Sequence, residues 1–269
     1  MPPSPDNRVN TAPAPILAVS GLTKYFGGLP ALFQVGFAIR AGQVTAIIGP
    51  NGAGKTTLIN CLTGVIRPDQ GAILFQGIDI AGLPAHRLAE LGISRTFQNL
   101  RLFPRLSVLD NVLCGLTIRA GQSFLQAMLH TPGLRHRERH LRLTALQALD
   151  TFTLTDKADL PAGILPYGEK KRLEMARAFV AGPVLTLLDE PVAGLNPEET
   201  AQIARLIGQL RRAGKTIVLV EHDMDMVMAI ADHVVVMDSG RVIAQGSPQA
   251  VQRNPLVLEA YLGRASSTA

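Results

Sequence analysis

The sequence predicts an α/β fold in which helices cover the faces of a parallel or mixed β-sheet. From Ile16 onward, short β-rich runs alternate with amphipathic helical patterns, an order typical of such sheets. Val44–Ile48 has the composition of a buried strand, and it leads directly into a glycine-rich turn and a helical run that starts at Lys55. Two later strands end in polar residues, and in open α/β sheets this edge binds ligands.

The two later strands are apolar runs followed by pairs of polar residues. They are Val184–Leu188 before Asp189-Glu190, and Thr216–Val220 before Glu221-His222. Farther along, His233–Met237 and Arg241–Gln245 flank the turn residues Asp238-Ser239-Gly240, which predicts a β-hairpin.

One helix is specified by its ends and by its apolar stripe. Asn196 suits the N-cap, Pro197 the first helical position, and Glu199 the capping box. An apolar stripe at helical spacing follows, and basic residues and a glycine close the helix. These residues are Ile203, Leu206, Ile207 and Leu210, then Arg211, Arg212 and Gly214.

The length of 269 residues suits one large α/β domain, or such a domain with a smaller subdomain inserted. Strand patterns disappear between about residues 94 and 179, so we expect an inserted helical subdomain there. The core is then formed by about residues 16–93 and 180–265. Residues 1–15 contain five prolines and little apolar pattern, and we expect a disordered tail.

Composition argues against several classes of protein. No stretch reaches the ~18 uninterrupted apolar residues of a membrane span, and the N-terminus lacks the pattern of a secretory signal. We therefore expect a chain that stays inside the cell and does not cross a bilayer.

Cys61 and Cys114 are too few for a disulfide framework, so we expect reduced, buried thiols. Aromatic residues make up only 4%, which argues against an aromatic platform for single-stranded nucleic acid, and we expect no nucleic-acid partner. The net charge of +5 permits an anionic partner but identifies none.

A phosphate-binding loop is the most specific motif. Residues 49–56, Gly-Pro-Asn-Gly-Ala-Gly-Lys-Thr, satisfy G-x-x-x-x-G-K-[ST] between a strand and a helix. The glycines let backbone N–H groups converge on phosphate oxygens, and the helix adds its positive N-terminal end. We expect Lys55 to reach the β- and γ-phosphates and the Thr56 hydroxyl to ligate Mg²⁺. A plain strand–turn–helix corner is the alternative, which the sequence context disfavours.

Polar residues at the other strand ends suit nucleotide hydrolysis. Asp189 can hold the water shell of Mg²⁺, and Glu190 can polarise an attacking water. His222 is placed to contact a γ-phosphate or that water. In isolation, a carboxylate pair is more often a helix cap or an ion pair, and a lone histidine is more often structural. The phosphate loop on the same sheet edge favours the functional roles.

These motifs, in this order, resemble those of ABC-type ATPase cassettes from about Leu17 to Gly263. The resemblance implies a P-loop NTPase (ABC ATPase) core with a mixed sheet, an N-terminal antiparallel β part and an inserted α-helical subdomain. The matching segments are Lys24-Tyr25-Phe26-Gly27 for the adenine-stacking aromatic, Thr96-Phe97-Gln98-Asn99 for the Q-loop, Leu165-Pro166-Tyr167-Gly168-Glu169 for the signature, Asp189-Glu190 for Walker B, Ala193-Gly194-Leu195-Asn196 for the D-loop and His222 for the switch histidine.

The resemblance also implies which residues bind ATP and Mg²⁺. Glu190, His222 and Lys55 would be catalytic, and Tyr25 is the alternative to Phe26 as the stacking residue. The residues implied to contact ATP are Phe26, Gly49, Pro50, Asn51, Gly52, Ala53, Gly54, Lys55, Thr56, Thr57, Gln98 and His222. Those implied to lie against Mg²⁺ are Thr56, Gln98 and Asp189. The signature residues would act on the ATP of a partner cassette.

A narrower resemblance is to the ATPase subunits of high-affinity branched-chain amino-acid importers. It implies a peripheral location on the cytoplasmic face of the membrane, with two integral-membrane permease subunits, a second cassette and, indirectly, an external substrate-binding protein. The features that carry it are the Tyr-Gly signature, the basic residues between Thr117 and Leu143, Gly194-Leu195-Asn196-Pro197, Glu221-His222-Asp223-Met224 and Ala260-Tyr261-Leu262-Gly263.

Other functions remain open at this point. The same role in an importer of urea, amides or other amino acids fits the same motifs. A soluble ABC ATPase acting on DNA or ribosomes usually has two cassettes or a long coiled coil, and this chain shows one cassette without sustained heptads. A P-loop kinase would share residues 49–56 but would not need the signature, Q-loop and switch motifs.

The signature departs from the family's usual Leu-Ser-Gly-Gly-Gln. Pro166 has neither a hydroxyl nor an N–H to offer a γ-phosphate, and Tyr167 replaces the first glycine, while Gly168 is kept. We therefore expect the site that this signature completes to be weaker than a standard one, and the cassette to form a heterodimer with a second cassette.

The helical insert contains two further polar patterns. Arg135, Arg139 and Arg142 share one helix face, which is either solvated or a contact for anionic lipid head groups. His136 and His140 stand at i, i+4, but no third ligand is evident and we expect no metal there.

Overall fold

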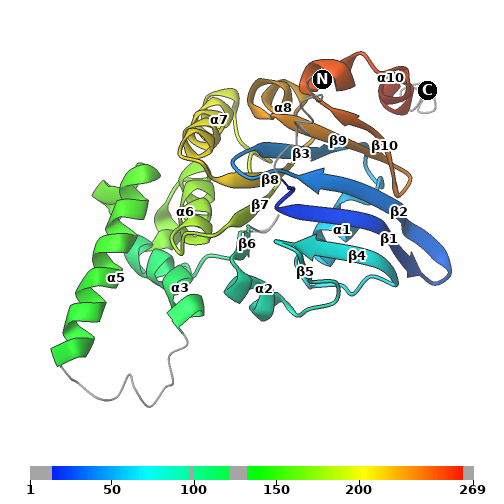
Figure 1. Ribbon diagram of the computed structural model, residues 1–269. Coiled ribbons are helices and arrows are strands. Elements are labelled where there is room, and N and C mark those ends of the chain that lie inside the picture. Colours follow the sequence, from blue (N-terminus) through cyan, green and yellow to red (C-terminus); the bar gives the residue numbers. More distant parts are fainter. Residues whose placement is uncertain (1–13, 97–99, 121–131, 263–269) are drawn as a thin grey trace, which may run out of the picture.

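The computed structural model describes residues 14–96, 100–120 and 132–262 (Figure 1). The expected tail at 1–15 therefore falls almost wholly outside the described residues. In chain order the elements are β1 (Leu17–Phe26), β2 (Leu29–Ile39), β3 (Val44–Ile48), α1 (Lys55–Leu62), β4 (Gln70–Phe75), β5 (Ile78–Asp79), α2 (Ala85–Leu91), β6 (Ile93–Arg95), α3 (Val108–Ala120), α5 (Pro132–Thr151), two 3₁₀ turns (Thr155–Lys157 and Ala162–Ile164), α6 (Tyr167–Phe179), β7 (Leu185–Asp189), α7 (Pro197–Arg212), β8 (Thr216–Val220), α8 (Met224–Ile230), β9 (His233–Asp238), β10 (Arg241–Gly246), α9 (Pro248–Gln252) and α10 (Pro255–Leu262).

Two sheets form the framework, as the fold class predicts. The larger has the strand order β10-β9-β3-β8-β7-β6, and all of its neighbouring pairs are parallel except the antiparallel pair β10 and β9. The smaller has the order β2-β1-β4-β5 and is antiparallel. The mixed sheet and the N-terminal antiparallel part are therefore both confirmed.

The predicted strands agree closely with the observed ones. The strands at 44–48 and 216–220 have the predicted bounds, whereas β7 begins and ends one residue later and includes Asp189. The β9–β10 hairpin is also confirmed, and its turn residues Ser239 and Gly240 have φ angles of 48° and 75°. Positive φ at both central positions is what a tight two-residue hairpin turn requires.

The core has two parts, one on each face of the larger sheet. Alternate residues of β3 divide between them, because side chains along a strand point to opposite faces. Val44, Ala46 and Ile48 pack with the helices of one face, while Ile47 packs with α1 and the smaller sheet. In Figure 1, α1 lies between the two sheets, and α6, α7 and α8 lie on the other side of the larger sheet.

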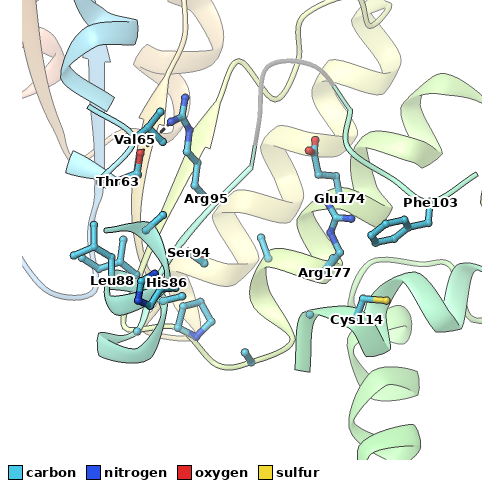
Figure 2. Close-up of a pocket in the computed structure, with 18 residues that line it drawn as sticks. Thr63, Val65, His86, Leu88, Ser94, Arg95, Phe103, Cys114, Glu174 and Arg177 are labelled. Carbon is cyan, nitrogen blue, oxygen red and sulfur yellow. Dashed lines mark hydrogen bonds between the residues drawn. The ribbon is translucent and has the colours of Figure 1, made fainter. Parts of the chain in front are cut away.

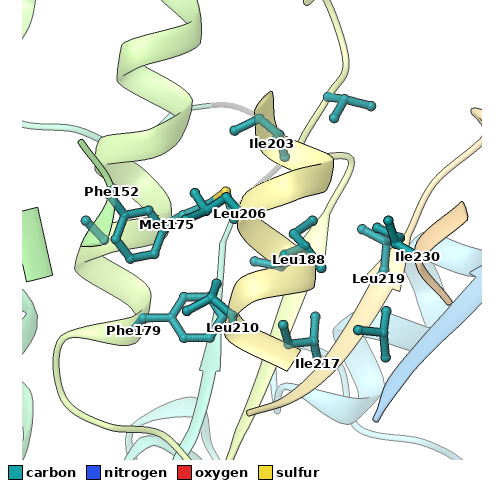
Figure 3. Close-up of a cluster of buried hydrophobic side chains, with 14 of the residues drawn as sticks. Phe152, Met175, Phe179, Leu188, Ile203, Leu206, Leu210, Ile217, Leu219 and Ile230 are labelled. Carbon is teal, nitrogen blue, oxygen red and sulfur yellow. The ribbon is translucent and has the colours of Figure 1, made fainter. Parts of the chain in front are cut away.

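Helix α7 joins the larger sheet to α6. Its apolar stripe is buried as predicted, and Figure 3 shows Ile203, Leu206 and Leu210 between the aromatic side chains near α6 and the aliphatic side chains of β7 and β8. The capping box is also confirmed: the Glu199 N–H donates to Asn196 Oδ1 at 2.9 Å, and the Asn196 N–H donates to Glu199 Oε2 at 3.1 Å.

The helical segment begins slightly later than the expected position of about residue 94. Ser94 and Arg95 belong to β6 and pair in parallel with β7, and their side chains form hydrogen bonds to Thr186 and Asp189 of that strand. After them, α3 and α5 extend away from the sheets (Figure 1). None of the helices within the described ranges is long and apolar enough to span a membrane.

The structure also tests the expected burial of the two cysteines and shows how exposed the polar side chains of α5 are. Cys61 is buried, and burial raises the pKa of its thiol to about 11. The expected burial of Cys114 is wrong: it is partly exposed, because it lines a groove between the core and α3. Arg139, Arg142, His136 and His140 are exposed, and the side chain of Arg135 lies outside the described residues.

Asn196→Ala removes the acceptor for the Glu199 N–H and half of the capping box. We expect the free energy of unfolding to fall by about 1 kcal/mol, measured by urea denaturation. Gln209→Ala, an exposed position in the same helix, is the matched control and should change it by less than about 0.5 kcal/mol. Equal effects of the two substitutions would contradict the assigned cap.

Candidate functional site

The register of three parallel strands brings the predicted site residues to one edge of the larger sheet. Ile47 of β3 pairs with Val220 of β8, which in turn pairs with Asp189 of β7. The three strands therefore end at the same level. The phosphate loop follows β3, Glu190 follows β7, and Glu221 follows β8, so all three segments begin at this edge.

The phosphate loop is packed so closely that two of its positions admit only glycine. A Cβ on Gly49 would lie 2.2 Å from the carbonyl oxygen of Met237. A Cβ on Gly54 would lie 2.6 Å from the carbonyl oxygen of Ala31, and its φ of 98° favours glycine as well. The Gly240 N–H also donates to the Ala53 carbonyl at 3.1 Å. The loop is therefore clamped between β2 and the β9–β10 turn.

A cavity of about 470 Å³ opens over this loop. It brings together most of the predicted phosphate-binding residues and Glu190, and it adds four residues that sequence reasoning missed. The lining residues are Asn51, Gly52, Ala53, Gly54, Lys55, Thr56, Thr57 and Glu190, with Pro30, Ala31, Ser239 and Gly240 as the additions. The turn at 239–240 was predicted as a turn, but only the fold brings it against the loop.

Lys55 is held inside the loop. Its Nζ donates to the carbonyl oxygens of Gly49 at 2.6 Å and Pro50 at 3.0 Å. Burial lowers the pKa of this lysine, and the negative charge of Glu190 opposes the shift. The α1 helix starts at Lys55, so its first N–H groups, which have no partner within the helix, also face this end. The arrangement offers a cation and helix N–H groups to an anion.

Asp189 is only 5% exposed and forms an ion pair with Arg95, which sequence reasoning missed. Arg95 Nη2 lies 2.7 Å from Asp189 Oδ2, and its Nη1 donates to Asn60 Oδ1 at 2.7 Å and Thr63 Oγ1 at 3.0 Å. The arginine thus connects the carboxylate to α1, the helix of the phosphate loop. The sequence carries no local signal for this pair, because the two residues lie 94 positions apart.

The segments after β7 and β8 are also tied together. Glu190 has a φ of 50°, and its N–H donates to the Val220 carbonyl at 2.9 Å. Glu221 is fully buried and accepts hydrogen bonds from the N–H groups of Val192 at 3.0 Å and His222 at 3.2 Å. Burial raises the pKa of Glu221, and these two hydrogen bonds oppose the shift.

Other predicted residues do not line the cavity. The His222 side chain is 63% exposed and is not among the residues that line the cavity. Phe26 is 50% exposed at the end of β1, with Lys24 Nζ 5.6 Å from its ring centroid. Gln98 lies outside the described residues.

The predicted signature residues lie at the start of α6 and do not line this cavity. Leu165 and Gly168 are buried, Glu169 is half-buried, and Pro166 and Tyr167 are exposed.

Comparisons with known proteins agree with this geometry. Residues 32–193, which span the phosphate loop, the signature and Asp189-Glu190, match the family described as ABC transporter. The chain belongs to the ABC transporter family. It is one of the family's ATP-binding cassettes, and thus an ATPase. Residues 241–266 match a second family, described as branched-chain amino acid ATP-binding cassette transporter.

Individual relatives of the cassette are similar over almost its whole length. BraF of Pseudomonas aeruginosa, a high-affinity branched-chain amino acid transport ATP-binding protein, is 46% identical over 93% of this chain and 99% of that protein. LivG of Escherichia coli, of the same description, is 41% identical over the same shares. An ABC transporter cassette solved in its ADP conformation is 34% identical, with a TM-score of 0.81 over 93% of this chain and 100% of that one.

Arg95→Met leaves Asp189 buried without its ion-pair partner. We expect the free energy of unfolding to fall by about 3 kcal/mol, because an uncompensated charge must be kept out of water. Arg87→Met is the matched control, since its pair with Glu90 at 2.9 Å is exposed and should be worth about 0.5 kcal/mol or less. Urea denaturation measures both variants, and a similar small change in both would refute a structural role of the buried pair.

Proposed function

We propose that this cassette hydrolyses ATP to drive the import of branched-chain amino acids. The observation that carries the proposal is the joint match of the chain's two regions, one to the ABC transporter family and the C-terminal one to the branched-chain amino acid cassettes. The names of BraF and LivG, which cover nearly the whole chain, support the same cargo.

The proposed chemistry follows from the cavity over the phosphate loop. Lys55 and the N–H groups at the start of α1 bind the β- and γ-phosphates, which replace the loop carbonyls as partners of the ammonium. Glu190, which shares this cavity, orients the attacking water and takes up its proton. His222, on the segment after β8, contacts the γ-phosphate when the partner cassette closes over it. Phe26, or alternatively Tyr25, stacks on the adenine.

The oxygen donors of the site suit Mg²⁺. The Thr56 hydroxyl and the Asp189 carboxylate are hard ligands of the kind this ion prefers, and Gln98 is the third residue proposed for it. When bound, the ion neutralises charge that develops on the phosphate oxygens. The ion pair with Arg95 fixes the direction of the Asp189 carboxylate, so the ligand is oriented before the ion arrives.

The second half of each ATP site is proposed to come from another cassette. A related cassette, 26% identical with a TM-score of 0.72, was solved as a dimer in a post-hydrolysis state bound to ADP and Pi. The exposed signature residues at the start of α6 are not among the residues that line this chain's own cavity, which suits action across a dimer. Because Pro166 lacks the serine hydroxyl, we propose a heterodimer with a cassette whose signature is closer to Leu-Ser-Gly-Gly-Gln.

A groove between the core and the helical segment suits a membrane subunit. It measures about 710 Å³, and Figure 2 shows residues of the core, such as His86 and Leu88, facing Phe103 and Arg177 of the helical segment. We propose that a permease segment docks here on the cytoplasmic side of the membrane, with a substrate-binding protein acting outside the membrane.

The first prediction concerns cargo and catalysis together. In a strain that lacks this gene, uptake of labelled leucine at submicromolar concentration should be lost, restored by the wild-type gene and not by Glu190→Gln. The substitution removes the base, so ATP hydrolysis should fall about 10²-fold or more while ATP binding is kept. Glu259→Gln, an exposed carboxylate on α10, is the matched control and should restore uptake.

Unchanged leucine uptake in the deletion strain would refute the proposed cargo. Loss of urea, amide or other amino-acid uptake in the same strain would then support the alternative importers. Full restoration of uptake by Glu190→Gln would refute the assigned base.

The second prediction concerns the dimer. With ATP and Mg²⁺, the purified Glu190→Gln chain should remain a monomer in light scattering, because the site that its own signature completes is weaker than a standard one. Adding Pro166→Ser and Tyr167→Gly gives Leu-Ser-Gly-Gly-Glu, which differs from the usual signature only at position 169, and this variant should form an ATP-dependent homodimer. A stable homodimer of the Glu190→Gln chain with its natural signature would count against heterodimerisation.

A further inference from the structure

A buried lysine in α6 stands between the signature and the end of β7. Lys171 is 2% exposed, and a buried ammonium is rare unless it is paired, because its desolvation is costly. Its Nζ donates to the main-chain carbonyl of Glu190 at 3.1 Å. Burial lowers the pKa of Lys171, while the charges of Glu174, Glu221, Glu190 and Asp189 favour its protonated form. The lysine therefore directs its Nζ at the backbone of the proposed base.

The backbone at that position is held in an unfavourable conformation. Glu190 has a φ of 50°, which non-glycine residues adopt only at an energetic cost when the surroundings impose it. Its N–H donates to the Val220 carbonyl at 2.9 Å, and its carbonyl accepts from Lys171 and from the Ala193 N–H at 3.2 Å. Hydrogen bonds on both sides of the Glu190 Cα thus set the direction of its side chain.

The tyrosine of the signature makes a second connection to the same segment. Tyr167 begins α6, and a Cβ built on Gly194 would lie 3.3 Å from its Cε1, so the ring packs directly on that glycine. The Lys171 ammonium lies 5.8 Å from the centroid of the same ring. One turn of α6 therefore contacts the chain both at Glu190 and at Gly194. A glycine at position 167, as in the usual signature, would make neither ring contact.

We infer that Lys171 is a positioning residue that holds Glu190 in its working direction and, with Tyr167, ties it to the signature end of α6. The inference rests on the proposed function, since Glu190 is the proposed base. Lys171 itself touches no substrate. When the signature meets the nucleotide of a partner cassette, any shift of α6 is passed to Glu190 through the hydrogen bond and to Gly194 through the ring.

The test compares the rate and the apparent affinity of ATP hydrolysis by the full-length chain in its assembled transporter. In Lys171→Met, kcat should fall about tenfold to a hundredfold, while KM for ATP stays within about twofold, because the base is misdirected and the phosphate loop is intact. Lys171→Arg keeps a cationic donor and should recover most of the rate. Lys215→Met, at the opposite end of β8 from Glu221, is the matched control and should behave as wild type.

Thermal unfolding of each variant separates positioning from folding. If Lys171→Met does not fold, Lys171→Gln keeps a polar group in place and should show the same loss of kcat, because its amide falls short of the Glu190 carbonyl. A kcat equal to that of Lys215→Met would overturn the inference. A parallel rise in KM, or a folded Lys171→Arg no better than Lys171→Met, would also overturn it. If the wild-type transporter does not hydrolyse ATP, the proposed function fails, and the inference fails with it.

Discussion

The parallel pairing of β3, β8 and β7 is the constraint on which the rest of the structure depends. Because parallel strands run in one direction, their carboxyl ends meet at one edge, where ligands bind in open α/β sheets. Ile47, Val220 and Asp189 lie at the same level across these strands. Segments that are far apart in the sequence thus become neighbours, and a one-residue shift of register would separate the phosphate loop from Glu190.

The edge also concentrates charge that is kept out of water. Lys55 is bonded to loop carbonyls, Asp189 to Arg95, Lys171 to the Glu190 carbonyl, and Glu221 to two backbone N–H groups. Each buried charge has a partner, since an unpaired one would cost several kcal/mol. The partners come from different elements, so the charges also fix how α1, α6 and the strands meet. Such fixed polar groups need little rearrangement to stabilise charge that develops during phosphoryl transfer.

Much of this could be predicted from the sequence, because the informative signals are local. The strand ends, the capping box of α7, the hairpin turn and the phosphate loop each depend on residues within a few positions of one another. Arg95 and Lys171 could not be predicted, because their partners lie 94 and 19 residues away and only the fold brings them together. The same holds for Ala31 beside the phosphate loop, and for Cys114, which patterning alone placed in the core.

The most direct test of the account is calorimetric titration of Mg²⁺ and ATP into the purified full-length chain, in parallel with Lys55→Met. The account predicts one ATP per wild-type chain and loss of most of that affinity in the variant, because Lys55 is the cation that faces the phosphates within the loop. Equal affinity of the two proteins for ATP would contradict it, since the nucleotide would then bind away from the edge where the three strands end.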